Sequence, residues 1–437
     1  MTVSAPGVRE RTATPARHRP RDAGAKSNGF PPTGVTLCVT RRLFGSLLGL
    51  VFLVNFGRTA FAPLLPELQT AFGVGPATVG VVASLVWLGT GAVRFPVGYL
   101  LTRVARHRVV VVSGVVLAAA AAFTAEADSV RTLQAGSLLI GLASGAYFAT
   151  AVPLIGDLFP EGVGRAVGVH GMSAQAAAVV APTVVVVVLA TASWRAVFWL
   201  LAGGSLLVTG VLVVATRGGA VPADAGADRN FRAALGHWRV IGTGILMIAT
   251  AGFVWQGLFN FYVSYLTTAK GVGTATASTL LTITFAAGVP AFWLGGRLAD
   301  RLPHVPYIVG LLVAFTAGVL ALTVVQGLAG LVAVSLLVGY VIHSLFPALD
   351  TYVLGALPAD ARGSTYAVFS GLSLLVEANG SGAVGVLTEA GYAFDTVFRA
   401  FAAGLAVVIV ALVVLSAVGR LPGTTGGVRP GTESHEG

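Results

Sequence analysis

The sequence predicts an all-α membrane protein in which twelve transmembrane helices form two pseudo-symmetric six-helix bundles. Composition is the first reason: 55% of the 437 residues are hydrophobic and 10% are charged, whereas a soluble domain has about 25% charged residues. The second reason is that the apolar residues fall into runs of about 20, the length that crosses a bilayer core. The third is a hydrophobic hairpin in the first half that returns in the second half.

Twelve apolar runs qualify as membrane spans. They cover residues 43–65, 78–101, 108–126, 132–157, 167–191, 194–215, 240–266, 275–298, 306–325, 328–356, 365–388 and 397–419. The polar stretch at 217–239 is the one long break between them and divides the spans six and six. We therefore expect an N-terminal six-helix bundle at 42–216, a cytoplasmic linker at 217–239 and a C-terminal six-helix bundle at 240–420.

The repeat is clearest in the hairpin of residues 55–108. Its turn, Phe72-Gly-Val-Gly-Pro-Ala-Thr78, returns as Lys270-Gly-Val-Gly-Thr-Ala-Thr276. On the same register, the Gly and Arg that begin and end the next turn also return. A weaker echo links residues 158–165 with 357–362. A shared register at two places indicates two halves of similar structure.

The ends of the chain and the loops predict the orientation. Residues 1–41 are rich in Arg, Pro, Ala and Gly without an apolar period, which is typical of a disordered basic tail; residues 421–437 are expected to be a disordered tail as well. The Arg41-Arg42 pair resembles an export signal, but a full span and many more follow it, which favours an anchor at the inner face. Every second loop is basic, so we expect both termini to be cytoplasmic and the protein to lie in the cytoplasmic membrane.

Several classes of protein are excluded by composition and motif. The net charge of +10 does not indicate nucleic-acid binding, because Lys and Arg fall between apolar runs and in the N-terminal tail. The single Cys38 excludes an intrachain disulfide and a cysteine-built metal site. No metalloprotease, nucleophile-elbow or Walker pattern stands where catalysis would need it. We expect no cofactor, no catalytic or metal site, and a monomer whose partners are lipid and a small-molecule substrate.

The turn after the second span of each half resembles the major facilitator superfamily signature Gly-x-x-x-Asp-Arg-x-Gly-Arg-Lys/Arg. The matching residues are Gly98, Thr102 and Arg103 in the first half, and Gly296, Asp300 and Arg301 in the second. The resemblance covers essentially the whole transmembrane region. It implies two six-helix bundles related by an axis along the membrane normal, the MFS fold, with a central cavity and alternating access by a secondary transporter.

The signature residues have an expected physical role. The glycines would let two helices meet closely, and the Asp and Arg residues would form a charged latch, the inner gate, against a neighbouring helix end. Thr102 replaces the Asp in the first half and weakens the latch there. The alternative is that these residues are only anchor charges on the inner face.

Arg58 is the leading candidate for substrate binding. Ionisable groups inside a span are costly and mark functional sites by default. Asn55 is about one turn away on the same face. The resemblance implies that the first span of each half lines the cavity, where Arg58 would attract an anionic group. An internal ion pair and snorkelling to the interface are the alternatives.

In the sequence repeat, Gln256 of the seventh span corresponds to Arg58. Family members that bind organic phosphate use paired arginines from these two helices, so Gln256 favours a monoanion or a polar neutral solute. Asn260, one turn further, could share the face of Gln256. Tyr262 is a further binding candidate, with packing as its alternative.

Arg94 in the second span corresponds to Phe292 in the repeat, so the scaffold itself does not require this charge. It either binds substrate from the inner side or belongs to the inner gate.

Two acids and a histidine are candidates for proton coupling. A carboxyl held between desolvation, which favours its neutral form, and a nearby Arg, which favours its charged form, can load and release a proton. Glu377 is either such a coupling site or the structural partner of an Arg, and Asp350 lies toward the inner half of its span. His343 could assist near neutral pH, or could be a packing residue.

The function that the sequence favours is secondary active transport of a small organic anion or polar metabolite, with or without proton coupling. The first alternative is multidrug-type efflux, favoured by the long Val/Ala-rich spans. The second is a receptor or regulator that kept the fold and lost turnover, supported by Thr102.

Overall fold

The computed structural model describes residues 1–2, 34–101, 103–159, 163–217, 235–357 and 362–422. Within these ranges the chain forms helices and no strand. The helices are α1 (Gly34–Thr59), α2 (Phe61–Phe72), α3 (Pro76–Ala92), α4 (Arg94–Leu100), α5 (Arg106–Ala125), α6 (Val130–Leu158), α7 (Val163–Leu189), α8 (Trp194–Arg217), α10 (Trp238–Asn260), α11 (Tyr262–Ala269), α12 (Thr274–Ala286), α13 (Gly288–Arg301), α14 (His304–Val324), α15 (Leu328–Gly355), α16 (Arg362–Glu377), α17 (Asn379–Glu389) and α18 (Phe394–Ala417).

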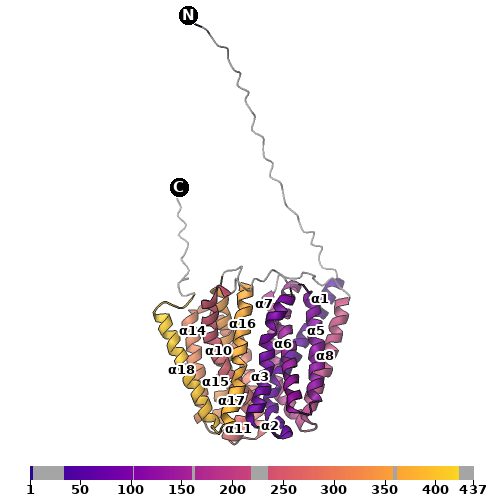
Figure 1. Cartoon of the computed structure of the whole chain (residues 1–437), viewed down its shortest axis with the longest axis vertical. Coiled ribbons are helices and arrows are strands. Elements are labelled where there is room, and N and C mark those ends of the chain that lie inside the picture. Colours follow the sequence, from indigo (N-terminus) through magenta and orange to yellow (C-terminus); the bar gives the residue numbers. More distant parts are fainter. Residues whose placement is uncertain (3–33, 102, 160–162, 218–234, 358–361, 423–437) are drawn as a thin grey trace.

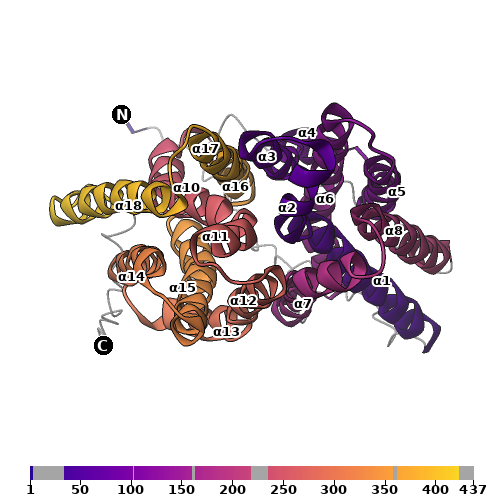
Figure 2. The same cartoon turned by 90° about the horizontal axis from the view of Figure 1, so that it is seen from below.

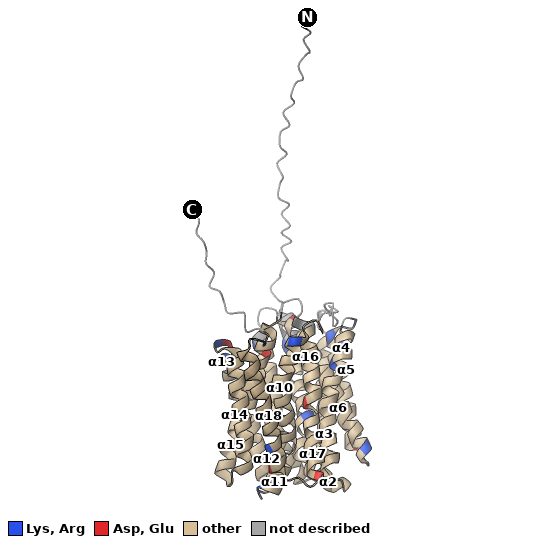
Figure 3. Ribbon diagram, turned by 60° about the vertical axis from the view of Figure 1, so that its left-hand side comes forward, with Lys and Arg blue, Asp and Glu red and all other residues tan. Residues whose placement is uncertain are grey.

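These helices confirm the predicted membrane architecture. Eleven helical segments in the described part are long and apolar enough to cross a membrane, and the bent pair α1–α2 makes a twelfth. Figure 3 shows charged residues mostly at the two ends of the bundle, with few between. We call the side where α1 begins and α18 ends the terminus side, and the other the opposite side (Figure 1).

The helices divide into two halves, α1–α8 and α10–α18, which stand side by side in Figure 2. The repeat is visible in their backbone. Gly73 and Gly271 lie in the turn of the first hairpin of each half. Their φ angles are 62° and 67°, a conformation that suits glycine. Gly141 on α6 lies against the carbonyl of Val86, and Gly339 on α15 lies against that of Thr284. Since these pairs keep the register read from the sequence, the two halves share one packing scheme.

Several predicted spans are broken near the middle of the bundle, which the sequence analysis did not anticipate. The breaks at Ala60, Val93 and Ala287 each come three residues before a proline. Proline has no N–H for the carbonyl four residues earlier and crowds that carbonyl, so the helix bends or stops. At the first break, α1 and α2 meet at 44°. Phe261 and Ala378 interrupt two further spans in the second half.

The most extensive contacts between the halves lie from mid-depth to the opposite side, and smaller contacts of α16 with α4 and of α13 with α7 lie nearer the terminus side. The long contacts are α3 with α17 and α7 with α12. Hydrogen bonds cross between the halves from the N–H of Ala77 to Glu389 Oε2 at 2.9 Å and from the N–H of Gly382 to Ser84 Oγ at 2.9 Å. In these two hydrogen bonds the donors are backbone N–H groups at small residues, Ala77 and Gly382, and small residues at close helix contacts are common in membrane proteins.

Some expectations fall on residues that the structure does not describe. Most of the tail at 1–41, of the linker at 217–239 and of the tail at 421–437 lies outside the described ranges, as do Thr102 and much of the 158–165 and 357–362 echo.

Candidate functional site

A cavity of about 270 Å³ lies between the two halves at mid-depth and extends toward the terminus side. Ligand pockets for drug-sized molecules are larger, about 300–1,000 Å³. Its charged lining residues are Arg58, Arg94, Asp350 and Glu377. The cavity is therefore small and carries two charged groups of each sign in a wall that also contains many aromatic side chains.

Arg58 stands next to the bend that ends α1 and is 8% exposed. Its guanidinium carbon lies 3.9 Å from the ring centre of Trp87 and 5.0 Å from that of Phe148, a cation–π arrangement. Among the described residues no carboxylate lies within 4.0 Å of it, and its buried Nε has no hydrogen-bond partner. The guanidinium thus has its faces on aromatic rings and hydrogen-bond donors left over at a cavity wall.

Arg94 is the first residue of α4, directly after the break at Val93, and lines the same cavity. Its Nε is also buried and unpartnered in the described part of the chain. The sequence predicts either substrate binding from the inner side or a place in the inner gate for Arg94. The structure adds that the second cationic group of the cavity comes from α4, while Gln256, the repeat partner of Arg58, lines the cavity as a neutral amide.

The two acids come from the C-terminal half. Glu377 ends α16, is 5% exposed and accepts no hydrogen bond from another described residue. Its charge interacts with those of Arg94 and Arg58, although neither is in ion-pair contact. Asp350 on α15 instead accepts a hydrogen bond from the Tyr366 hydroxyl at 2.7 Å. Glu377 is therefore the acid with its acceptor sites open.

Neutral polar groups complete the cavity wall. Asn55 faces the cavity and donates to the carbonyl of Ala174 at 2.7 Å. His343 Nδ1 lies 2.6 Å from the carbonyl of Gly339. Because a carbonyl only accepts, Nδ1 carries the hydrogen and Nε2 faces the cavity. The ring packs edge-on to Trp255, 5.6 Å between centres, so His343 is held in one orientation.

Gln175 on α7 belongs to this site and was missed by sequence reasoning. Its Nε2 donates across the halves to the carbonyl of Phe285 at 2.7 Å and lies 3.5 Å from His343 Nε2. That carbonyl lies two residues before the α12–α13 break at Ala287. The available signal was a lone amide inside an apolar span, the same kind of signal that Gln256 gives in the seventh span.

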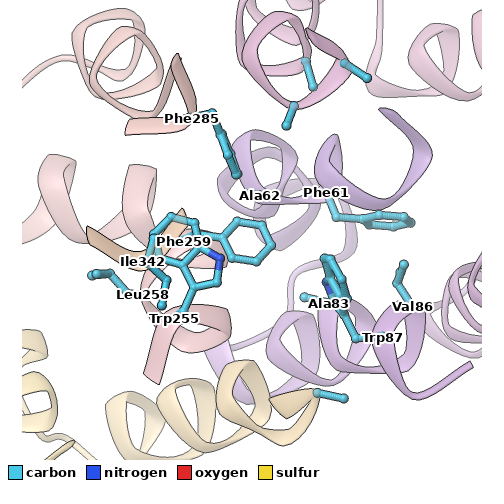
Figure 4. Close-up of a cluster of buried hydrophobic side chains, with 14 of the residues drawn as sticks. Phe61, Ala62, Ala83, Val86, Trp87, Trp255, Leu258, Phe259, Phe285 and Ile342 are labelled. Carbon is cyan, nitrogen blue, oxygen red and sulfur yellow. The ribbon is translucent and has the colours of Figure 1, made fainter. Parts of the chain in front are cut away.

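Aromatic side chains close the cavity toward the opposite side. Trp87 from one half meets Phe259 from the other with ring centres 6.0 Å apart, and Trp255 packs on Phe259 at 5.4 Å. Figure 4 shows these rings facing one another with Phe285 and Phe61 nearby. Together with the hydrogen bonds on that side, they separate the polar cavity from the opposite face.

Asn260 and Tyr262 do not line this cavity in the described state, so their role in substrate binding stays a prediction. Asn260 is fully buried and donates to Ser381 Oγ at 2.9 Å, and the Tyr262 hydroxyl lies 2.6 Å from Ser335 Oγ. Asn260 ends α10 one helical turn beyond Gln256, and Tyr262 begins α11 after the break at Phe261; both lie in the packed interior of the C-terminal half. Both residues hold helices together.

The signature loop differs in part from its expected role. A side chain at Gly296 would meet nothing, whereas the neighbouring Gly295 lies against Ser344; the close helix approach therefore belongs to Gly295. Gly98 is buried. Asp300 and Arg301 are exposed on the terminus side, without an ion pair to a described residue.

The ion pair on the terminus side of the N-terminal half uses a later position of the signature, its second arginine. Arg106 at the start of α5 pairs with Asp157 at the end of α6, while the guanidinium carbon of Arg103 lies 4.7 Å from the ring centre of Tyr99. The latch charge expected at Arg103 is thus found three residues later.

Comparisons with known proteins agree with this architecture. The family model described as Major Facilitator Superfamily matches residues 47–381. The chain is 24% identical over 278 residues to the probable sulfoacetate transporter SauU of Cupriavidus necator, covering 60% of this chain and 65% of that protein. It therefore spans slightly less than two thirds of the length of that relative.

Solved structures share the fold. A bacterial homologue of the human lysosomal transporter Spinster, in an inward-facing and unoccupied conformation, has a TM-score of 0.69 at 18% identity, covering 87% of this chain and 95% of the other. The occupied inward-facing structure gives a TM-score of 0.66 at 17% identity, covering 86% and 94%.

Proposed function

Because the chain belongs to the major facilitator superfamily, a family of transporters and not of enzymes, we propose that it is a secondary active transporter for a small solute with an anionic group. The observation that carries this proposal is the guanidinium of Arg58, buried at the cavity wall without a carboxylate partner in the described part of the chain. Leaving a charge unpaired inside a bundle is costly, so a ligand that supplies the missing anion gains the corresponding free energy.

The size of the cavity and the name of the relative SauU both support a small solute as the cargo. The volume of about 270 Å³ suits a solute of a few heavy atoms. The relative SauU is named for sulfoacetate, a two-carbon compound with a sulfonate and a carboxylate. Either group can accept two parallel hydrogen bonds from a guanidinium. We infer that Arg58 anchors a sulfonate or carboxylate, with Arg94, Asn55 and Gln256 available around it.

Glu377 is the proposed coupling residue. When Arg58 takes an anion from solution, the Glu377 carboxylate loses part of the positive field that favours its charged form. A proton on Glu377 then restores the charge balance of the cavity. For a solute that carries only negative charge, this predicts that one proton moves with it, with Asp350 held aside by Tyr366.

Alternating access gives the path. We propose that the described state opens toward the terminus side, because the joints between the halves lie from mid-depth to the opposite side. Transport then requires these joints to part and the terminus side to close. Loops with Arg lie on the terminus side, which we assign to the cytoplasm by the positive-inside bias.

The alternatives have less support. Four charged side chains in a small cavity oppose a lipophilic drug as cargo, because a drug would leave them desolvated and unpaired. The receptor alternative rested on Thr102, which lies outside the described residues.

Uptake by the purified full-length chain in proteoliposomes tests the proposal. With labelled isethionate (2-hydroxyethanesulfonate) as probe, Arg58→Gln is expected to lower kcat/KM by about a hundredfold, since a hydrogen-bonded charge pair contributes about 1.5–3 kcal/mol. Arg131→Gln, at an exposed arginine outside the cavity, is the matched control and should leave uptake unchanged. Equal uptake by the two variants would contradict the anchor.

A further inference from the structure

The charges of the cavity are sorted by half. Both arginines, Arg58 and Arg94, come from the N-terminal half, and both carboxylates, Asp350 and Glu377, come from the C-terminal half. The cavity therefore has a cationic wall and an anionic wall. We use these two names for the pairs Arg58 with Arg94 and Asp350 with Glu377.

The two walls face one another without closing. Neither arginine has a carboxylate within 4.0 Å among the described residues, yet the charge of Glu377 acts on both arginines. Opposite charges in a medium of low dielectric attract strongly. The arginines and the carboxylates nevertheless remain apart, with the cavity between them. This separation leaves room for a ligand.

A simple anion suits only one of these walls. At the cationic wall it gains charge-assisted hydrogen bonds, but it also approaches the carboxylates of the other wall. Like charges in a desolvated site repel, so a proton would have to enter with it. A solute with a cationic group at its other end removes this need, because that group pairs with a carboxylate directly.

We propose that the cargo is a small zwitterion, with its sulfonate or carboxylate on Arg58 and its ammonium group on Glu377; this rests on the proposed transport function. Glu377 receives the ammonium because its acceptor sites are open, whereas Asp350 already accepts from Tyr366. Such a ligand bridges the two halves. It replaces an anion and its proton with one molecule and leaves the net charge of the loaded cavity unchanged.

Three two-carbon sulfonates of nearly equal size separate the possibilities. Taurine carries an ammonium, isethionate a hydroxyl and sulfoacetate a carboxylate at the end remote from the sulfonate. Competition against labelled taurine, with the full chain in proteoliposomes, measures their relative affinities. β-Alanine, 3-hydroxypropanoate and malonate repeat the test with a carboxylate as the anchored group.

In the wild-type chain the ammonium member of each series is expected to bind tighter than the hydroxyl member by roughly tenfold or more, the effect of one charge-assisted hydrogen bond. Glu377→Gln should abolish this preference and leave binding of the hydroxyl member intact. Glu126→Gln, at an exposed loop acid, is the matched control and should keep the preference. Proton uptake, followed with a pH-sensitive dye inside the vesicles, should accompany isethionate but not taurine.

The outcomes are distinct. If the wild-type chain binds the hydroxyl members or the dianionic members with the same affinity as the ammonium members, the proposal of a zwitterionic cargo is wrong. The proposal of an anion transporter would then still hold. Retention of the preference in Glu377→Gln also overturns the assignment of the ammonium. If no member of either series binds, the anchor at Arg58, and with it the proposed function, is wrong.

Discussion

The two halves of this molecule share a scaffold and differ in chemistry. At the turns and at the closest helix contacts they repeat one another: Gly73 with Gly271, and Gly141 with Gly339. At the cavity they do not, since Arg58 corresponds to Gln256 and Arg94 to Phe292. The repeated positions are those where the backbone leaves no choice of side chain. The positions that diverged face the cavity, where side chains are free of packing constraints, and it is there that each half acquired its own charge.

Moving the charge across the repeat is the strongest test of this comparison. Arg58→Gln should reduce isethionate uptake about a hundredfold, and adding Gln256→Arg should recover at least part of it, because both positions face the same cavity. Arg58→Gln with Gln256→Leu is the control and should recover nothing. Failure of the folded double variant to regain uptake would mean that the halves are not interchangeable at the cavity.

The shared packing can be tested next. Gly141→Val and Gly339→Val should each lower the free energy of unfolding by about 1–3 kcal/mol, as overpacking does, because each new side chain meets a carbonyl of the neighbouring helix. Thermal unfolding in detergent measures the loss. Gly210→Ala on α8, where nothing lies within 4 Å, should change stability by no more than about 1 kcal/mol. Unequal losses at 141 and 339 would weaken the claim of one packing scheme.

The acid of the C-terminal half sets the third prediction. Isethionate accumulation should rise as the outside pH falls, by about tenfold for each pH unit of imposed gradient if one proton moves with each solute. Glu377→Gln is neutral at all pH values and should remove this dependence without abolishing binding. Counterflow with equal pH on both sides is the control and should continue in the variant. A gradient-driven variant would assign the proton to another group.

The smallest expected effect concerns the joint on the opposite side. Glu389 of the C-terminal half accepts from the N–H of Ala77 in the N-terminal half, and this hydrogen bond is exposed to solvent. Glu389→Gln should therefore weaken the contact between the halves by roughly 0.5 kcal/mol, or about twofold in population. Spin labels at the exposed residues Thr70 and Thr268 would report the change as a larger share of long distances. An unchanged distribution would place the closing force in the aromatic contacts instead.

Much of this architecture could be predicted from the sequence because hydropathy and repetition are properties of segments. Run length identified the spans, and one register related the halves. Lone charges inside spans were enough to find Arg58, Arg94, Asp350 and Glu377, since each is too costly to keep in lipid without a reason. All four line the cavity.

What could not be predicted depends on rotation about helix axes. Asn260 lies beside Gln256 as helical spacing predicts, with its Nδ2 3.3 Å from Gln256 Oε1, but it faces Ser381 and not the cavity. Tyr262 follows the break at Phe261 and packs against Ser335. Gly296 was chosen over Gly295 because the motif names it, whereas the contact with Ser344 falls one residue earlier. A one-residue shift turns a side chain by about 100°, which motif matching does not resolve.

The broken spans have a mechanical consequence. Arg58, Arg94 and Glu377 each lie within two residues of a helix break. The groups proposed to bind the solute are therefore next to the points at which the helices bend. A change in the bend at a break would reorient the neighbouring charged side chain. Solute binding and bending of the cavity wall would then be a single movement. Replacing Pro63 or Pro96, which do not themselves line the cavity, would therefore stiffen the wall and weaken solute binding together.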